Sequence, residues 1–461
     1  MEHQEMRGRR ALVVGLGKSG VAAAKLLARE GCDVAVADGK PEAELIPQLL
    51  ELQGIVRESF LGGLREEAFA GRELVVVSPG VPLSLPVLQE AKRHAELVGE
   101  VELASRYIDE PIIGITGTNG KSTTTALTAH LLATAGKRVF AGGNLGTPLS
   151  QRVLDGGPLD VSVCELSSYQ LESTVFMRCH AATVLNVTPD HLDRYPSMEA
   201  YATAKERIFE SQREGDLAVL NAADPRVRAM RTRRGVERAL FDPRHPSPER
   251  GDASGKVAAA TAIRTGPRML EVHGQSYALH APTLRGAHNA ENALAAILLA
   301  RHLGANAKAI QRALSSYPGL PHRLELVLVK DGVEWLNDSK ATNVDSVEKS
   351  LSAFEASGAR VILILGGRGK GAPYAPLRLL FAGRVKALLT IGEDAPRIGD
   401  ELGDLAPLHP CGTLAAAVEK ARTLARKGDA VLLSPACASY DQFKNFEDRG
   451  AQFQRLARGL A

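Results

Sequence analysis

The chain has 461 residues and a formal net charge of +3, from 56 lysines and arginines against 53 aspartates and glutamates. Hydrophobic side chains make up 44% of it and charged ones 24%, which suffices for folded cores and argues against intrinsic disorder. The length predicts about three domains. The small net charge and an aromatic content of only 4% argue against a nucleic-acid partner.

The spacing of the cysteines and the length of the apolar runs indicate the cellular compartment. The five cysteines show no C-x-x-C spacing, so neither a disulfide framework nor a zinc ribbon is predicted. The N-terminus shows no signal-peptide pattern, and the apolar stretch at 293–300 is far shorter than the roughly 20 residues that cross a bilayer. We therefore expect a cytoplasmic protein without a membrane partner.

The first hundred residues alternate short apolar runs with helical patterns. Strands are predicted at 11–15, 33–38 and 73–80, in the βαβ rhythm of a parallel sheet. The turn after the first strand reads GLGKSG, with Asp38 at the end of the second strand. Taken alone, this G-x-G-x-x-G suggests a dinucleotide site.

A second α/β segment begins with a predicted strand at 111–116 and continues through a glycine turn into a helix. The turn reads TGTNGKST, where Lys121 and Ser122 suit polyphosphate and Mg²⁺, and the backbone N–H groups suit phosphate oxygens. It departs from the G-x-x-x-x-G-K-[ST] consensus, because Ile115 stands where the first glycine belongs. The alternative is a structural glycine turn.

Further candidates for metal binding follow this turn. Glu165 ends an apolar strand, and Asp190, His191 and Asp193 cluster in TPDHLDRY. Their alternatives are an ordinary strand-end acid and a capped turn. Lys205 lies on a predicted helix and is either a solvated lysine or, beside Mg²⁺, a carbamate, because an ammonium cannot ligate a cation.

The last third of the chain predicts another doubly wound sheet. Strands are expected at 333–338, 361–367, 385–392 and 430–436, separated by helical segments. Between the second and third segments, residues 225–282 are rich in Arg, Pro, Gly and Ser. For these we expect irregular surface structure with a small antiparallel patch.

Nine motifs in order resemble the Mur ligases of peptidoglycan synthesis. They are TGTNGKST, CELSSYQLE, NVTPDHLDRY, YATAKERIF, RGAHNAENALAA, PGLPHRLE, NDSKATN, LGGRGKG and SPACASYDQFKNFEDRG, and the resemblance runs from about residue 11 to 455. It implies an α/β protein of three domains: a Rossmann-like domain for a UDP substrate at 1–99, a P-loop ATP-binding domain at 100–319, and a doubly wound, Rossmann-like glutamate-binding domain at 320–461.

The resemblance also implies a reaction. An ATP-dependent amide ligase would activate UDP-N-acetylmuramoyl-L-alanine as an acyl phosphate and add an amino acid, releasing ADP and phosphate. The NDSKATN motif and the last motif favour D-glutamate as that amino acid. ATP and two Mg²⁺ ions are the implied cofactors, and we expect a monomer.

Residue roles implied by the resemblance fall into five groups. Lys121, His191 and Lys205 are catalytic, and the Mg²⁺ ligands are Ser122, Glu165, His191 and a carbamylated Lys205. Nucleotide contacts are Gly117, Thr118, Asn119, Gly120, Lys121, Ser122, Thr123, Asn292, Arg323 and Asp338. UDP contacts are Lys18, Ser19, Asp38, Ser78, Pro79 and Gly80, with Asn144 and Gln170 at the muramoyl part. Glutamate contacts are Lys340, Thr342, Lys370, Ser439 and Phe446.

Three other functions stay open at this point. A folylpolyglutamate synthase shares the ATP domain and amide chemistry but should lack a UDP-type first domain, NDSKATN and SPACASYDQF. A nicotinamide dehydrogenase is the interpretation of GLGKSG alone. A non-catalytic nucleotide-binding scaffold is disfavoured, because the phosphate lysine and the candidate metal ligands are all present.

Overall fold

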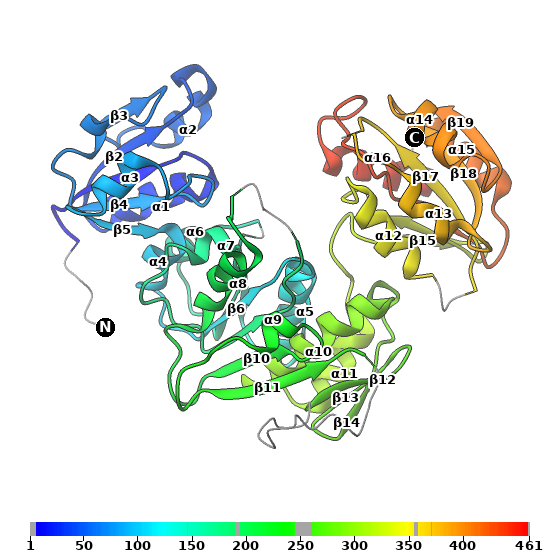
Figure 1. Cartoon of the computed structure of the whole chain (residues 1–461), viewed down its shortest axis with the longest axis horizontal. Coiled ribbons are helices and arrows are strands. Elements are labelled where there is room, and N and C mark those ends of the chain that lie inside the picture. Colours follow the sequence, from blue (N-terminus) through cyan, green and yellow to red (C-terminus); the bar gives the residue numbers. More distant parts are fainter. Residues whose placement is uncertain are drawn as a thin grey trace. The chain divides into compact units, whose positions relative to one another are not determined.

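The computed structural model describes residues 6–144, 146–189, 194–244, 261–354, 358–369 and 371–459. The chain divides into two compact units, one comprising Met1–Ile263, Glu271–Gln275 and Glu291–Ile310, the other Arg264–Leu270, Ser276–Ala290 and Gln311–Ala461. In the described part, the strands form three sheets with helices packed on them (Figure 1). The α/β class predicted from the sequence is confirmed.

The N-terminal sheet has the order β3-β2-β1-β4-β5, and all its pairs are parallel. Its strands are buried on both faces because helices cover both: residues of β1 alternate between a core with Leu26 and a core with Leu88. The elements are β1 (Arg10–Val14), α1 (Lys18–Arg29), β2 (Asp33–Asp38), α2 (Ile46–Glu51), β3 (Glu58–Leu61), β4 (Leu74–Val77), α3 (Pro86–Ala91) and β5 (Glu96–Gly99).

The second sheet has the order β14-β13-β12-β11-β10-β9-β6-β8-β7, with parallel pairing from β12 through to β7. Its strands are β6 (Ile112–Thr116), β7 (Val139–Gly143), β8 (Val161–Glu165), β9 (Ala181–Val184), β10 (Leu217–Asn221), β11 (Glu237–Asp242), β12 (Ala262–Gly266), β13 (Met269–Val272) and β14 (Gln275–Ala278). The helices are α4 (Glu100–Ser105), α5 (Lys121–Thr134), α6 (Leu149–Asp155), α7 (Ser168–Leu171), α8 (Met198–Glu206), α9 (Pro225–Arg228), α10 (Ala287–His302) and α11 (Ala307–Ser316).

The expectation of irregular structure over 225–282 was wrong for two strands. β11 pairs in parallel with β10, and β12 pairs in parallel with β11, so both extend the sheet. β11 reads ERALFD, and only its central Ala239, Leu240 and Phe241 are buried. The polar ends of such a strand hide it from a search for apolar runs, and its parallel partner is what decides its structure.

The third sheet has the order β15-β16-β20-β17-β18-β19, parallel except for the antiparallel edge strand β15. Helices pack on both faces, since one core contains Leu351, Leu377 and Ile398 and the other contains Val418 and Phe453. The elements are β15 (Glu325–Lys330), β16 (Val333–Asn337), α12 (Val344–Ser352), β17 (Val361–Gly366), α13 (Arg378–Phe381), β18 (Val385–Ile391), α14 (Ala395–Leu402), β19 (Leu408–Gly412), α15 (Leu414–Leu424), β20 (Ala430–Leu433) and α16 (Phe446–Arg458).

Helix length and hydropathy also bear on the membrane question. Over the described ranges, none of the helices combines the length and apolar character needed to span a bilayer.

Candidate active site

The glycine turn after β6 forms a strand–loop–helix unit. β6 ends at Thr116, α5 begins at Lys121, and the turn has positive φ at Gly117 (+151°) and Gly120 (+85°). The Lys121 Nζ folds back and donates to the carbonyl oxygens of Gly117 and Thr118, each at 2.9 Å. Ile115 is a fully buried residue of β6, so the loop starts at Gly117 and the missing first glycine falls inside the strand.

Asn292 closes this turn from the side of α10. Its Oδ1 accepts from the Thr124 Oγ1 at 3.2 Å. A Cβ added at Gly120 would lie well under 3.0 Å from the same oxygen. Cβ atoms in proteins essentially never come that close to another heavy atom. The close approach explains why residue 120 is a glycine. It also places Asn292, a predicted nucleotide contact, against the phosphate loop.

Ser122 and Thr123 begin α5, as the motif requires. Ser122 is half-buried in the first turn, and Thr123 is buried. Thr118 donates from Oγ1 to the Thr188 carbonyl at 3.2 Å, which ties the loop to the segment after β9. The first turn of α5 thus presents backbone N–H groups, a hydroxyl and a lysine around one loop, the arrangement that binds phosphate.

Glu165 lies beside this loop at the end of β8. The register pairs Ile115 with Glu165, and the Leu166 N–H donates to the Ile115 carbonyl at 2.9 Å. Glu165 is only 3% exposed, and its Oε1 accepts from the Asn144 Nδ2 at 2.7 Å. Its Oε2 is buried and has no hydrogen-bond partner among the described residues. An unpartnered buried carboxylate oxygen is costly and suits a hard cation such as Mg²⁺.

Lys205 is a buried lysine, so its interpretation as a solvated helix residue was wrong. Its side chain on α8 is 1% exposed, and its Nζ lies 4.5 Å from the centre of the Tyr201 ring. The Nζ donates to the Gly117 carbonyl at 3.0 Å, the same oxygen that Lys121 contacts. The two lysines therefore converge on one oxygen of the phosphate loop.

Several candidates lie outside the described residues. They are Asp190, His191, Asp193 and Lys370. Among the residues that are described, no three His, Cys, Asp or Glu side chains cluster closely enough to hold a metal.

Six predicted residues gather at the carboxyl edge of the N-terminal sheet. β1 and β4 are neighbours there although the chain forms β2 and β3 between them, and such reversals leave a ligand crevice. Asp38 accepts from the Leu16 N–H through Oδ2 at 2.6 Å, and the Ser78 Oγ donates to the Gly15 carbonyl at 2.6 Å. Lys18 and Ser19 begin α1, while Pro79 and Gly80 follow β4.

Asn144 and Gln170, predicted at the muramoyl part, both contact other protein groups. Asn144 donates to Glu165, as described above. Gln170 is buried and accepts from the Ser167 N–H through Oε1 at 2.9 Å, which forms a capping box at the start of α7. Each residue fixes a turn after β7 or β8, and their substrate contacts stay a prediction.

Asp338, at the end of β16, is a buried carboxylate in the second unit. Its Oδ2 accepts from the hydroxyls of Ser350 (2.5 Å) and Ser434 (2.7 Å), and its Oδ1 accepts from the Leu324 N–H (3.2 Å). Burial raises its pKa to about 6, and the hydrogen bonds and the positive charge of Arg323 only partly offset this.

The predicted glutamate contacts lie on loops after neighbouring strands. Lys340 and Thr342 follow β16, Ser439 follows β20, and the Lys340 Nζ is 5.8 Å from the ring of Phe446, the first residue of α16. Sequence reasoning missed the residue that joins these loops. Arg449 is fully buried and donates through Nη2 to the carbonyls of Ser339 (2.9 Å) and Cys437 (3.1 Å), and burial lowers its pKa to about 10.

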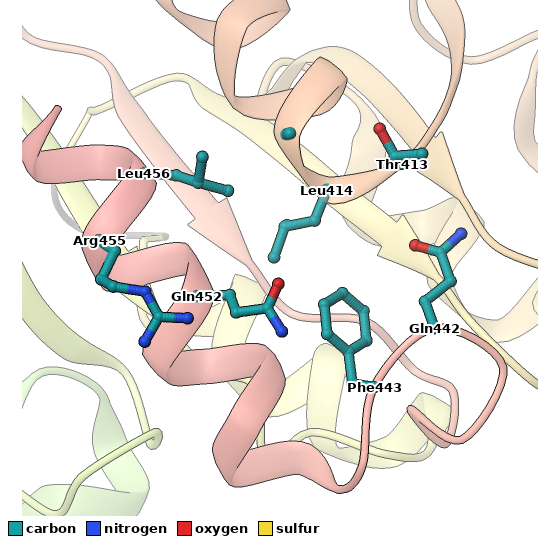
Figure 2. A pocket seen from close by; sticks show the side chains of 8 residues that line it. Thr413, Leu414, Gln442, Phe443, Gln452, Arg455 and Leu456 are labelled. Atoms are coloured by element: carbon teal, nitrogen blue, oxygen red, sulfur yellow. The ribbon is translucent and has the colours of Figure 1, made fainter. Parts of the chain in front are cut away.

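A separate pocket lies between the start of α15 and α16 in the same unit (Figure 2). Figure 2 shows Leu414 and Phe443 on its apolar side, with Thr413 and Arg455 at its margin. Its lining contains none of the predicted site residues.

Comparisons with known proteins place the chain in a family. Three family models match in order: Mur ligase MurD-like N-terminal domain at 9–99, Mur ligase middle domain at 115–300, and Mur ligase glutamate ligase domain at 322–437. The chain belongs to the Mur ligase family. The resemblance seen in the nine motifs is confirmed. Since the N-terminal Mur ligase model covers GLGKSG, the dehydrogenase interpretation of that motif is not supported.

Two relatives that match along their full length carry the same name. The chain is 56% identical to the UDP-N-acetylmuramoylalanine--D-glutamate ligase of Anaeromyxobacter dehalogenans and 50% identical to that of Myxococcus xanthus, over 99% of each chain. Two solved structures are similar in fold alone. MurF from Acinetobacter baumannii matches at a TM-score of 0.59 with 17% identity, covering 100% of this chain and 92% of that one. A pseudomurein peptide ligase type C from Methanothermus fervidus matches at 0.57 with 20% identity, covering 98% and 100%.

Proposed function

We propose that this Mur ligase joins D-glutamate to UDP-N-acetylmuramoyl-L-alanine with conversion of ATP to ADP and phosphate. The full-length relatives named for this reaction support the substrate pair. The observation that carries the chemistry is the convergence of Lys121 and Lys205 on the Gly117 carbonyl, next to the open carboxylate oxygen of Glu165. These contacts support the proposal of a phosphate loop with a metal-binding acid on the neighbouring strand.

The reaction needs activation because a carboxylate is a poor electrophile. The carboxylate oxygen of the UDP substrate takes the γ-phosphoryl group of ATP, which gives an acyl phosphate and ADP. The amine of D-glutamate then forms a bond to the carbonyl carbon and loses a proton, and the C–O bond to phosphate breaks. The Lys121 ammonium and the N–H groups at the start of α5 stabilise the negative charge on the transferred group.

The residues around the loop suit Mg²⁺. Glu165 Oε2 and the Ser122 hydroxyl would hold one ion, which when bound neutralises phosphate charge. The second ion, with His191 as a ligand, belongs to the proposal on the strength of the family resemblance alone.

A carbamate on Lys205 would remove the repulsion between the positive charges of Lys121 and Lys205. The two Nζ atoms share one oxygen and so lie no more than about 6 Å apart, where two positive charges repel by on the order of 3 kcal/mol at an effective dielectric of about 20. The neutral Lys205 amine adds to CO₂: an N–C bond forms, one C=O electron pair moves to oxygen, and a proton leaves to solvent. The product exchanges repulsion for attraction toward Lys121 and supplies oxygen ligands for Mg²⁺.

The remaining predicted contacts complete the proposal. The crevice of Asp38 and Ser78 would hold UDP, and Asn292, Arg323 and Asp338 would bind the nucleotide, Asp338 through the ribose. The loops joined by Arg449 would hold the amino acid through Lys340, Thr342, Ser439, Phe446 and Lys370. The domain ranges 1–99, 100–319 and 320–461 are part of this proposal.

A panel assay tests the substrates. Phosphate release is measured with UDP-N-acetylmuramoyl-L-alanine, ATP and Mg²⁺ against D-glutamate, L-glutamate, L-lysine and meso-diaminopimelate. D-glutamate should be turned over well above the others. Faster turnover of L-glutamate or a diamino acid would overturn the substrate assignment and leave the ligase class intact.

Three lysine variants test the site. Lys121→Ala should abolish phosphate release, because it removes the cation that would stabilise the negative charge on the transferred phosphoryl group. Lys205→Ala should nearly abolish it too, and short carboxylates such as acetate should restore part of the activity. With ¹³C-labelled bicarbonate, the wild-type protein should show a carbamate carbon signal that Lys205→Ala lacks. High activity of Lys205→Arg would refute the carbamate, because a guanidinium cannot form one.

A further inference from the structure

A single asparagine outside the phosphate loop pairs with the loop through its whole amide. Asn186 follows β9, and its Oδ1 accepts from the Asn119 N–H at 2.8 Å while its Nδ2 donates to the Asn119 carbonyl at 3.3 Å. The side-chain amide thus pairs with one residue of the loop as a second backbone would.

The backbone of Asn186 also forms a hydrogen bond to the loop. Its carbonyl accepts from the Thr118 N–H at 2.9 Å, and the preceding Leu185 N–H donates to the Thr116 carbonyl at 2.9 Å. Two successive loop residues, 118 and 119, are therefore bonded to the same asparagine. The parallel pairing of β6 and β9 continues in this way into the turn, where no regular strand exists.

Glu291 fixes the direction of the amide. The second hydrogen of the Asn186 Nδ2 points to the Glu291 Oε1 at 3.1 Å, and the Asn221 Nδ2 donates to the same oxygen at 3.2 Å. Only this orientation of Asn186 satisfies all three contacts, because a flipped amide would set its oxygen against a carboxylate and a carbonyl. Glu291 precedes Asn292 on α10, the helix whose Asn292 accepts from the Thr124 hydroxyl of α5.

We infer that Asn186 is a positioning residue that presets the phosphate loop for nucleotide, with Glu291 holding its amide. This inference rests on the proposed function, since it concerns the loop that would bind ATP. Loop conformations unable to bind reduce apparent affinity by the fraction of time they are populated. Asn186 removes such conformations before the nucleotide arrives, without contacting the reacting atoms.

The decisive experiment is a double-variant cycle in which calorimetry measures the affinity for Mg·ADP. Asn186→Asp keeps the size and Oδ1 but places a carboxylate against the Asn119 carbonyl and Glu291, so affinity should fall roughly tenfold or more. In the double variant Asn186→Asp/Glu291→Gln, the repulsion between two carboxylates is removed, while an amide N–H turned toward the aspartate would also face the Asn221 Nδ2, so affinity should recover only in part, by about threefold. Glu291→Gln alone keeps its oxygen acceptor and should change affinity by about twofold at most.

Asn306→Asp is the matched control. It adds the same charge at an exposed asparagine whose Oδ1 accepts from the Ala309 N–H at 2.9 Å, a contact that an aspartate keeps. Its affinity for Mg·ADP should equal that of the wild-type protein. Wild-type affinity in Asn186→Asp, or no recovery in the double variant, would overturn the inference.

Two further readouts separate positioning from a general structural role. In ligase assays Asn186→Asp should raise the KM for ATP and leave the KM for D-glutamate unchanged. In the unliganded wild-type protein, the amide hydrogens of residues 118 and 119 should already exchange slowly, which needs no variant to fold; immediate exchange would contradict a preset loop. Nucleotide binding is measured without substrate, so a failed amino-acid panel would leave this inference standing.

Discussion

Replacing Gly120 by alanine tests the closest approach in the phosphate loop. The added Cβ would come well under 3.0 Å from the Asn292 Oδ1, at a residue with φ of +85°. The left-handed backbone costs an alanine about 1–2 kcal/mol. Asn292 must also turn away and lose its bond to the Thr124 hydroxyl, which adds about 1 kcal/mol. We expect Gly120→Ala to lower the free energy of unfolding by about 2–3 kcal/mol in total.

Gly136, just after the other end of the same helix, is the matched control. Its φ is +90°, yet a Cβ added there meets no atom of the described residues within 4 Å. Gly136→Ala should therefore show the backbone cost alone, about 1–2 kcal/mol. Urea denaturation of both variants isolates the clash as their difference, and calorimetry with Mg·ADP should show a loss of affinity of at least about tenfold for Gly120→Ala only.

Equal destabilisation by the two alanines, with ADP binding unchanged, would refute the reasoning. It would mean that Asn292 adjusts at no cost and that Gly120 serves only the left-handed turn. The contact between Asn292 and the loop would then carry no part of nucleotide binding.

Three further outcomes are expected. Glu165→Gln keeps the Oε1 acceptor for Asn144 but removes the charge of the open oxygen, so calorimetry should show that Mg²⁺ no longer strengthens ADP binding. Burial raises the pKa of Asp338 to about 6, so the folded state holds this proton more tightly than the unfolded state does. The stability that this group contributes is therefore complete below about pH 4 and is lost as the pH rises through 6. In urea denaturation, Asp338→Asn should remove that loss. Burial likewise raises the pKa of Glu100 to about 7, so Glu100→Gln should remove a loss of stability between about pH 5 and 7, whereas a wild-type pH profile in either variant would contradict the assignment.

Two strands that are apolar throughout were predicted well, although β10, which reads LAVLN and is buried at every residue, was not predicted. ALVVG and VILILGG became β1 and β17, which are buried on both faces of parallel sheets. β3, with two exposed and two half-buried residues, and the antiparallel edge strand β15 were not predicted. Their structure depends on a neighbouring strand that supplies hydrogen bonds, and no local pattern reports that neighbour.

The same limit applies to the site. Lys121, Ser122 and Gly120 could be found because the phosphate loop is contiguous in sequence and its chemistry requires those residue types. Asn186 acts on a loop residue 67 positions away, and Arg449 on a loop 110 positions away. Their functions exist only in the folded chain, because an asparagine or an arginine alone specifies no partner.

The number of hydrogen bonds that a buried acid already accepts indicates which kind of ligand it can still bind. A carboxylate offers about four lone-pair directions. Among the described residues, Asp338 uses three of them on Ser350, Ser434 and the Leu324 N–H, and the fourth, on Oδ1, is where the proposed ribose hydroxyl would donate. Glu165 instead has one buried oxygen, Oε2, with no hydrogen-bond partner among the described residues. A single neutral donor suits the first arrangement and a cation suits the second, so two acids that motifs alone describe alike have different expected ligands.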